Sequence, residues 1–239
     1  MSIMQLERLL RSQGFGSRSE CRSLICSERV RVGTERCVDP YAEFESDGFQ
    51  FSVDNTGWTY RKFVYLALNK PANYECSHQP KHHSSVYSLL PDVLRNRRIQ
   101  AVGRLDADTT GLLLLSDDGQ FIHTYTSPRK HIPKVYDVTV KHPLDELQVA
   151  ALLDGVCLHD SLAPVAAVRC EIRSARLLRM TVTEGRYHLV KRMVAAAGNR
   201  VDRLNRQSIG GLALPESLPI GEWTWLETAD LARLAQHPQ

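Results

Sequence analysis

A lone carboxylate stands in a turn between two apolar segments of the chain. Asp106 belongs to the run 103–106, Gly-Arg-Leu-Asp, with residues 99–102 before it and the fully apolar residues 112–115 after it. Both flanking segments have the composition of short strands, and Asp117-Asp118-Gly119 closes the second. Loop residues held by rigid strands are favoured positions for catalysis. The pattern therefore predicts that Asp106 is presented to a substrate.

Two other interpretations of this segment remain open. Residues 106–110 fit the D-x-D-x-T pattern of phosphotransfer enzymes of the haloacid dehalogenase type, in which an aspartate is the nucleophile and a divalent metal is required. That pattern needs its apolar strand immediately before the first aspartate, whereas here the strongest apolar run follows it. The segment could also be an ordinary polar hairpin whose acids are solvated.

A second group of reactive side chains lies about 80 residues downstream. Residues 184–193 read Glu-Gly-Arg-Tyr-His-Leu-Val-Lys-Arg-Met, and we expect them to open a helix that ends at a Gly198 cap. Apolar residues at helical spacing form its inner stripe, which leaves His188, Lys191 and Arg192 off the core face. Basic residues in such places often only solvate a helix. Residues 134–140, with Tyr136 near their start, alternate as a strand does.

These segments together resemble the RsuA-type pseudouridine synthases. The resemblance rests on the G-R-L-D run at 103–106, the K-x-Y run at 134–136 and the E-G-R-x-H segment with its K-R-M at 184–193. Further matches are L-N-K-P at 68–71, I-G-G-L at 209–212 and G-E-W at 221–223. The resemblance spans essentially the whole chain, and it is strongest to the members that act on small-subunit ribosomal RNA. Leu189 replaces a usual glutamine, Val194 a common aromatic residue, and Pro133 precedes the tyrosine strand.

The resemblance implies isomerisation of uridine to pseudouridine in ribosomal RNA, most directly small-subunit (16S) RNA. Asp106 would be the catalytic nucleophile, Lys191 the cation that keeps it ionised, and Tyr136 the ring that stacks on the flipped uracil. Bonds broken and formed balance, so we expect no cofactor and no metal. The alternatives are a synthase acting on large-subunit RNA and a non-catalytic RNA-binding ribosome-assembly protein.

Composition sets the broad class of the protein. The chain has 239 residues, 43% of them apolar, and a net charge of +3, which is too mild to indicate nucleic-acid binding by itself. We find no signal peptide and no apolar run of membrane-spanning length. We therefore expect a cytoplasmic protein, a monomer without membrane contact, whose partner is ribosomal RNA or a ribosomal assembly intermediate.

The N-terminal residues predict a small separate module. A short amphipathic helix around residues 6–10 is followed by a capping box, Ser17 to Glu20, that starts a second helix, and by a strand at residues 29–32. Seven arginines and no lysine lie between residues 8 and 36. The helix-helix-hairpin order resembles the S4 RNA-binding domain, and residues 55–57 are interpreted as a linker.

The expected fold is therefore α+β: a small S4-like α/β module at residues 1–58, then a catalytic domain at residues 59–239. The catalytic domain is expected to have a large, mainly antiparallel mixed sheet with flanking helices. Arginine suits bidentate phosphate contacts. The expected RNA-binding residues are Arg18, Arg22, Arg29, Arg31, Arg104, Arg186 and Arg192.

The region between Tyr74 and Arg98 is expected to be a mobile polar loop with a possible short helix at residues 86–90. Cys76, His78, His82 and His83 place soft ligands there, but a metal clip is disfavoured because paired ligand spacing is missing. The six cysteines lack any C-x-x-C pair, which favours reduced thiols. Basic clusters at 95–98 and at Arg200, Arg203 and Arg206 could form rims that grip RNA.

Overall fold

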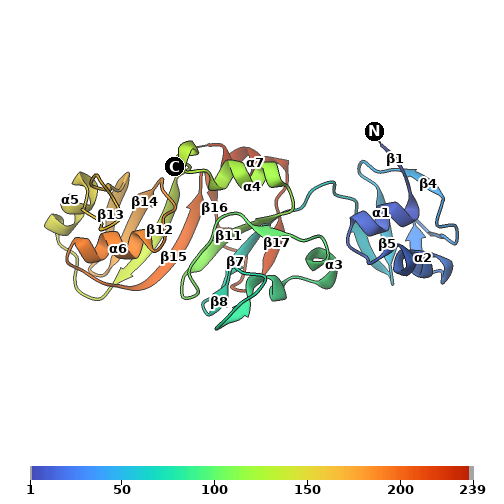
Figure 1. Ribbon diagram of the computed structural model, residues 1–239, viewed down its shortest axis with the longest axis horizontal. Coiled ribbons are helices and arrows are strands. Elements are labelled where there is room, and N and C mark those ends of the chain that lie inside the picture. The colour runs from blue at the N-terminus through green and yellow to red at the C-terminus, as the bar shows by residue number, and fades with distance from the viewer. Residues whose placement is uncertain (1, 237–239) are drawn as a thin grey trace. The chain divides into compact units, whose positions relative to one another are not determined.

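The chain forms two compact units in the computed structural model, which describes residues 2–236 (Figure 1). The first unit comprises Met1–Val64 and Leu90–Ile99, and the second comprises Tyr65–Leu89 and Gln100–Gln239. Within the described residues, no helix has the length and apolar character needed to cross a membrane. The units are described separately below.

The first unit packs two helices on a small antiparallel sheet. Strand β1 (Ile3–Gln5) pairs with β4 (Glu43–Glu45), and helices α1 (Leu6–Ser12) and α2 (Arg18–Cys26) follow β1 in the chain. The sheet has the order β3-β2-β5-β6, from β3 (Glu35–Arg36), β2 (Val30–Val32), β5 (Gln50–Val53) and β6 (Thr56–Thr59). The predicted capping box is present, because Ser17 and Glu20 each accept from the other's backbone N–H.

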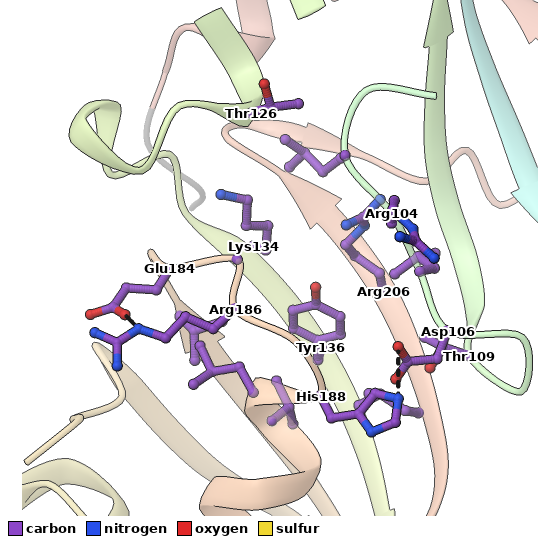
Figure 2. A pocket seen from close by; sticks show the side chains of 18 of the residues that line it. Arg104, Asp106, Thr109, Thr126, Lys134, Tyr136, Glu184, Arg186, His188 and Arg206 are labelled. Atoms are coloured by element: carbon purple, nitrogen blue, oxygen red, sulfur yellow. Dashed lines mark ion pairs between the residues drawn. The ribbon is translucent and has the colours of Figure 1, made fainter. Parts of the chain in front are cut away.

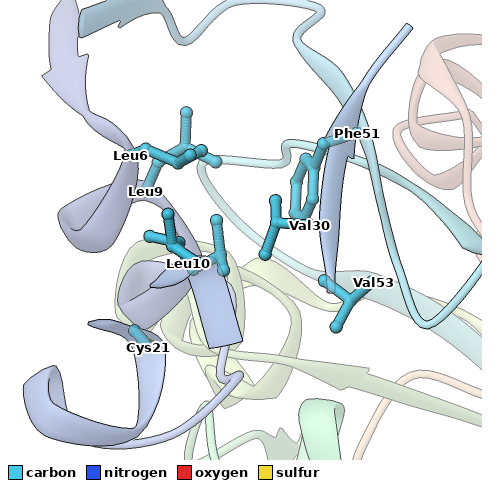
Figure 3. Close-up of a cluster of buried hydrophobic side chains, with 8 residues drawn as sticks. Leu6, Leu9, Leu10, Cys21, Val30, Phe51 and Val53 are labelled. Carbon is cyan, nitrogen blue, oxygen red and sulfur yellow. The ribbon is translucent and has the colours of Figure 1, made fainter. Parts of the chain in front are cut away.

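The core of this unit is apolar and fully enclosed. Leu6, Leu9 and Leu10 of α1 meet Val30 and Phe51 of the sheet (Figure 3). Helix α3 (Asp92–Arg95) belongs to this unit as well.

The segment predicted as a linker is instead a hairpin turn. Asp54 and Asn55 both have positive φ, 52° and 64°, and they join β5 to β6. Positive φ at both central residues defines the type I′ turn, whose twist matches that of paired strands. Thr56 and Gly57 then pair with β5, so residues 55–57 lie inside the small sheet.

The second unit is built on one large mixed sheet, which confirms the predicted fold class. Its described strands have the order β13-β14-β12-β15-β11-β7-β17, with β10 and β16 attached at β11 and β15. Every pairing is antiparallel except that of β11 with β15. The strands are β7 (Tyr65–Lys70), β10 (Gln100–Ala101), β11 (Thr110–Ser116), β12 (Lys134–Val140), β13 (Arg169–Ser174), β14 (Leu177–Val182), β15 (Val201–Ile209), β16 (Leu212–Ala213) and β17 (Trp223–Trp225).

Helices and short pieces complete this unit. Figure 1 shows α4 and α7 beside each other over the end of the sheet near β11 and β16. Their apolar side chains cover a core that includes Leu112, Leu114 and Ile209. The other elements are β8 (Tyr74–Glu75), β9 (Ser84–Ser85), η1 (Val86–Leu89), α4 (Gly119–Thr126), η2 (Pro128–Lys130), α5 (Glu146–Asp154), α6 (Leu189–Ala196) and α7 (Thr228–Leu234).

The parallel pairing of β11 with β15 places residues 110–111 beside residues 205–206. Gly111 pairs with Arg206, and a Cβ at Gly111 would lie 2.4 Å from the Arg206 carbonyl oxygen. Its φ of +99° also disfavours any side chain. Glycine at this position thus permits the close approach of the two strands on which much of the candidate site is built.

Candidate active site

Asp106 lies in the turn that joins β10 to β11. The N–H of Thr109 donates to the Asp106 carbonyl at 3.1 Å and closes the turn. The side chain is 24% exposed, so its carboxylate can be reached from solvent. Two basic groups from the second reactive segment lie against it, because Lys191 Nζ is 3.0 Å from Oδ2 and His188 Nε2 is 3.3 Å from Oδ1 (Figure 2 draws the histidine pair).

The helix that supplies these groups begins later than the sequence predicts. Helix α6 starts at Leu189, and residues 184–188 approach it as irregular chain. His188 has a left-handed backbone, φ 49° and ψ 29°, directly before the helix, which ends the extended approach of the chain. His188, directly before the helix, and Lys191, in its first turn, both contact Asp106. His188 was not among the predicted catalytic residues, although its spacing from Lys191 was visible in the sequence.

Lys191 also bonds to a second carboxylate. Its Nζ donates to Oδ1 and Oδ2 of Asp108 at 2.7 and 2.9 Å. Burial opposes the charged form of Asp108, but the hydrogen bond and the charge of Lys191 outweigh it and lower the pKa of that carboxyl. In the same way, burial works against the ammonium of Lys191, yet its bonds to both aspartates raise its pKa. Lys191 therefore stays protonated, and Asp106 keeps a cation beside it.

A cavity of about 120 Å³ lies beside Asp106. Tyr136 of β12, only 9% exposed, lines it together with Arg104, Lys134 and Arg206 (Figure 2). Polar and apolar side chains share the rest of its lining. The apolar ones include Val102, Leu105, Val182, Leu189, Val190, Leu204 and Ile209. The arrangement suits one flat, partly apolar ring held next to a carboxylate and over a tyrosine.

A buried lysine holds the Asp106 turn from behind. Lys70, at the end of β7, has no exposed surface, and its Nζ donates to the carbonyl oxygens of Pro71, Ala107 and Thr109 at 3.0, 3.0 and 2.8 Å. Burial lowers the pKa of Lys70 to about 8. The N–H of Asn73 adds a bond to the Ala107 carbonyl at 2.7 Å. The L-N-K-P run carried this signal, but its lysine had been given no role.

The loop between Tyr74 and Arg98 is organised around one carboxylate. Glu75 accepts from the backbone N–H groups of Lys81, His82 and His83 at 3.0, 2.8 and 3.0 Å. These bonds give the predicted polar loop a defined path, and its short helix appears as η1. Among the described residues, no cluster of three or more histidine, cysteine or acidic side chains could hold a metal ion.

Comparison with known proteins decides the class of this site. Residues 64–196 match the family model described as RNA pseudouridylate synthase, which is more than half of the chain. The chain belongs to this family. It is 34% identical to ribosomal small subunit pseudouridine synthase A of Haemophilus influenzae, over 98% of this chain and 100% of that protein. It is 42% identical to the Yersinia pestis protein of that name, over 70% and 71% of the two chains.

A solved structure gives the same result. A crystal structure of a pseudouridylate synthase shares 33% identity with this chain, has a TM-score of 0.68 and covers 97% of this chain and 99% of that one. The protein is thus an RNA pseudouridine synthase, an isomerase of uridine in RNA. The family match begins at residue 64 and leaves the N-terminal module outside it.

The arginines expected to bind RNA in this pseudouridine synthase lie in different settings. Arg104 is exposed at the cavity, and Arg186 pairs with Glu184 at 2.6 Å beside it. Arg192 pairs with Asp160. In the N-terminal unit, Arg18 and Arg22 both contact Glu7, Arg29 pairs with Asp54, and Arg31 lies on β2.

One basic cluster of the synthase differs from its prediction. Arg200 and Arg203 are exposed, but Arg206 is only 3% exposed and lines the cavity. Arg206 therefore does not belong to a solvated rim. Successive residues of a strand face opposite sides, so Arg203 and Arg206, three positions apart on β15, point to opposite faces of the sheet.

Proposed function

We propose that this synthase isomerises a specific uridine of small-subunit ribosomal RNA, with Asp106 as the nucleophile. The names of its relatives support the RNA class, since two relatives that are 42% and 34% identical to it are named as small-subunit enzymes. One observation supports the residue: Asp106 is a partly buried carboxylate at the cavity, held between His188 and Lys191. A buried carboxylate stays ionised only when a cation compensates its lost hydration.

The reaction breaks the bond between N1 of uracil and C1′ of ribose and forms a bond between C5 and C1′. A proton leaves C5 and one is gained at N1, so the atoms of substrate and product are the same. Asp106 bonds to C1′ of the ribose as the bond to N1 breaks, and it leaves again as a carboxylate when C5 bonds to C1′. Tyr136 stacks on the base that has been taken out of its helix. Lys191 keeps a positive charge 3.0 Å from Asp106 throughout. Neither a metal nor a cofactor is needed to balance these steps.

The N-terminal unit is proposed as the S4-like RNA-binding module. Its arginines gather around Glu7, a 3% exposed carboxylate that Arg18 and Arg22 contact. Arg8, Arg11 and Tyr41 line the same groove of about 560 Å³. Because one acid is set against several cations, the groove keeps a net positive charge that suits a phosphate backbone. We place the protein in the cytoplasm, as a monomer that meets ribosomal RNA or an assembly intermediate.

Mapping of pseudouridine tests this function. Unmodified small-subunit and large-subunit RNA transcripts are treated with the purified protein or with Asp106→Asn, then probed with carbodiimide, which marks pseudouridine although its mass equals that of uridine. We expect one wild-type-dependent site in small-subunit RNA. A site in large-subunit RNA alone would overturn the proposed target, and equal modification by Asp106→Asn would overturn the proposed nucleophile.

A further inference from the structure

Arg206 carries hydrogen-bond donors that the described protein does not use. Its Nε donates to the carbonyl of Leu112 at 2.8 Å, which anchors the side chain between β15 and β11. Its Nη2 is buried and has no acceptor among residues 2–236. A buried donor without a partner is unfavourable and uncommon, and a guanidinium is always charged. A buried arginine beside a cavity whose Nη2 has no acceptor therefore points to an acceptor that arrives with the ligand.

A bulge in the strand pairing aims this side chain at the cavity. Tyr136 pairs with Arg206, but Val135 pairs with Ser208, so Gln207 is an extra residue on β15. Because of this extra residue, Arg206 shares a cavity with Tyr136 while Ser208 lines a different one (Figure 2 shows the first two). Bulges often re-aim a side chain next to an active site.

The acidic side chains that line this cavity already form ion pairs with other basic residues. Asp106 contacts Lys191 and His188, and Glu184 pairs with Arg186. Arg206 thus faces no free carboxylate there. Lys134 lines the same cavity and adds a second cation, whose pKa is lowered to about 8 by burial first and by the charge of Arg206 second. With these acids paired, Arg206 and Lys134 leave the cavity with an excess of positive charge.

We propose that Arg206 donates to a carbonyl oxygen of the target uracil and stabilises the negative charge on the base while it is detached from the sugar. The proposal rests on the proposed function, because it needs a uridine reacting at Asp106. When the bond from N1 to C1′ breaks, both electrons stay with the base, which becomes an anion whose charge spreads over N1 and the two carbonyl oxygens. The charge is lost again when the electron pair of C5 bonds to C1′, and the later transfer of a proton from C5 to N1 leaves the base neutral. A fixed donor aimed at charge that develops and disappears lowers the barrier.

The position favours a base oxygen over a phosphate. The cavity is small, about 120 Å³, and Arg206 is joined there by apolar side chains such as Leu204 and Ile209. Arg104, which is exposed and lines the same cavity, is available for a phosphate. An arginine side chain can only donate hydrogen bonds, so it can bind the carbonyl oxygen at C2 or C4 of uracil. If it faces the C4 position, it disfavours cytosine, which carries an amine there.

Sulfur substitution in the RNA tests the contact atom by atom. Single-turnover rates are measured for target RNA carrying uridine, 2-thiouridine or 4-thiouridine at the reactive position, because sulfur is a weaker acceptor than oxygen. The proteins are wild type, Arg206→Met, Arg206→Lys and the control Ser208→Ala, which removes another unpartnered buried group from the same strand. We expect Arg206→Met to lower the rate with uridine by on the order of 10². We expect Ser208→Ala to behave as wild type.

The decisive result is whether the rate loss from sulfur in the RNA and the rate loss from Arg206→Met are independent of each other. If Arg206 bonds one carbonyl oxygen, sulfur at that oxygen slows wild type but has no further effect in Arg206→Met. The proposal is overturned if sulfur at either oxygen slows Arg206→Met by the same factor as wild type. It is also overturned if methylphosphonate at the target phosphates slows wild type but has no further effect in Arg206→Met. If Arg206→Met fails to fold, Arg206→Lys decides, since its sulfur penalty must differ from that of wild type. An inactive wild type would instead reject the proposed function.

Discussion

Lys191 Nζ lies 3.0 Å from Oδ2 of Asp106. The same ammonium lies 2.7 Å from Asp108, so one cation is shared between two carboxylates of one turn. The two acids differ in exposure, with side chains 24% and 69% exposed. Asp106 lines the cavity whereas Asp108 faces largely solvent, so we expect only Asp106 to react and Asp108 to hold the lysine.

Asp106→Asn is expected to reduce pseudouridine formation by on the order of 10⁴ or more, because an amide cannot replace a nucleophilic carboxylate. RNA affinity should be nearly unchanged, as measured by filter binding. Asp108→Asn is the matched control and should be much milder. Equal damage from both substitutions, together with a requirement for magnesium, would favour phosphotransfer chemistry instead.

Lys191→Met is expected to cripple turnover and to destabilise the protein. It leaves two carboxylates close together, one of them partly buried, and breaking such a pair by removing one partner is costly. Lys191→Arg keeps the charge and should retain substantial activity. Turnover and thermal unfolding of both variants are the measurements. A fully active Lys191→Met protein would show that the lysine only covers the helix surface.

Lys70→Met is expected to change the pH dependence of stability. The pKa of Lys70 falls from 10.5 in the unfolded chain to about 8, so the unfolded state binds more protons between these values. Stability from this group is lowest below pH 8 and rises toward pH 10.5, by about 3 kcal/mol. Urea unfolding of wild type and Lys70→Met across that range should differ by this rise, while Lys141→Met, at an exposed lysine, should follow wild type.

The same variant tests whether Lys70 positions the catalytic turn. Loss of its ammonium leaves the carbonyls of Ala107 and Thr109 without that donor on either side of Asp108. We expect a fall in the rate of the chemical step with RNA affinity little changed. A Lys70→Met protein with normal turnover would show that the turn keeps its geometry without the lysine.

Local signals in the sequence were enough for several elements. The alternation of residues 134–140 predicted a strand that the structure places at Lys134–Val140, and the Ser17 and Glu20 pair predicted the start of α2. These features depend on neighbours within a few residues. The start of α6 was placed too early because the left-handed conformation of His188 has no reliable sequence signal.

Features that depend on distant contacts could not be read in the same way. Lys70 bonds to carbonyls 37 and 39 residues away, so its partners are set by the pairing of β7 with β11. The burial of Arg206 depends on the bulge at Gln207, which only the pairing of β12 with β15 reveals. Sequence alone assigned Lys70 no role and grouped Arg206 with a surface cluster, because the role of each is set by strand pairing inside the sheet.

Removal of cations from the N-terminal groove is expected to weaken RNA binding in a salt-dependent way. Deleting residues 1–58 is a poor test, because Gln13 and Gly14 form hydrogen bonds with Arg97 and Asn96 that the deletion would leave unmade. Point changes at Arg8 and Arg18 are cleaner, since both side chains are exposed at the groove and Arg22 still neutralises Glu7.

The double variant Arg8→Gln and Arg18→Gln should flatten the dependence of log affinity on log salt. Each phosphate contact contributes about 0.7 to 0.9 to that slope, so two contacts contribute about 1.4 to 1.8. The apparent Michaelis constant should rise, whereas turnover at saturating RNA should change little because Asp106, Tyr136 and Lys191 are untouched. Arg36→Gln, which removes an exposed arginine paired with Glu28 outside the groove, is the control. A slope in the double variant equal to that of the control would remove this groove from RNA binding.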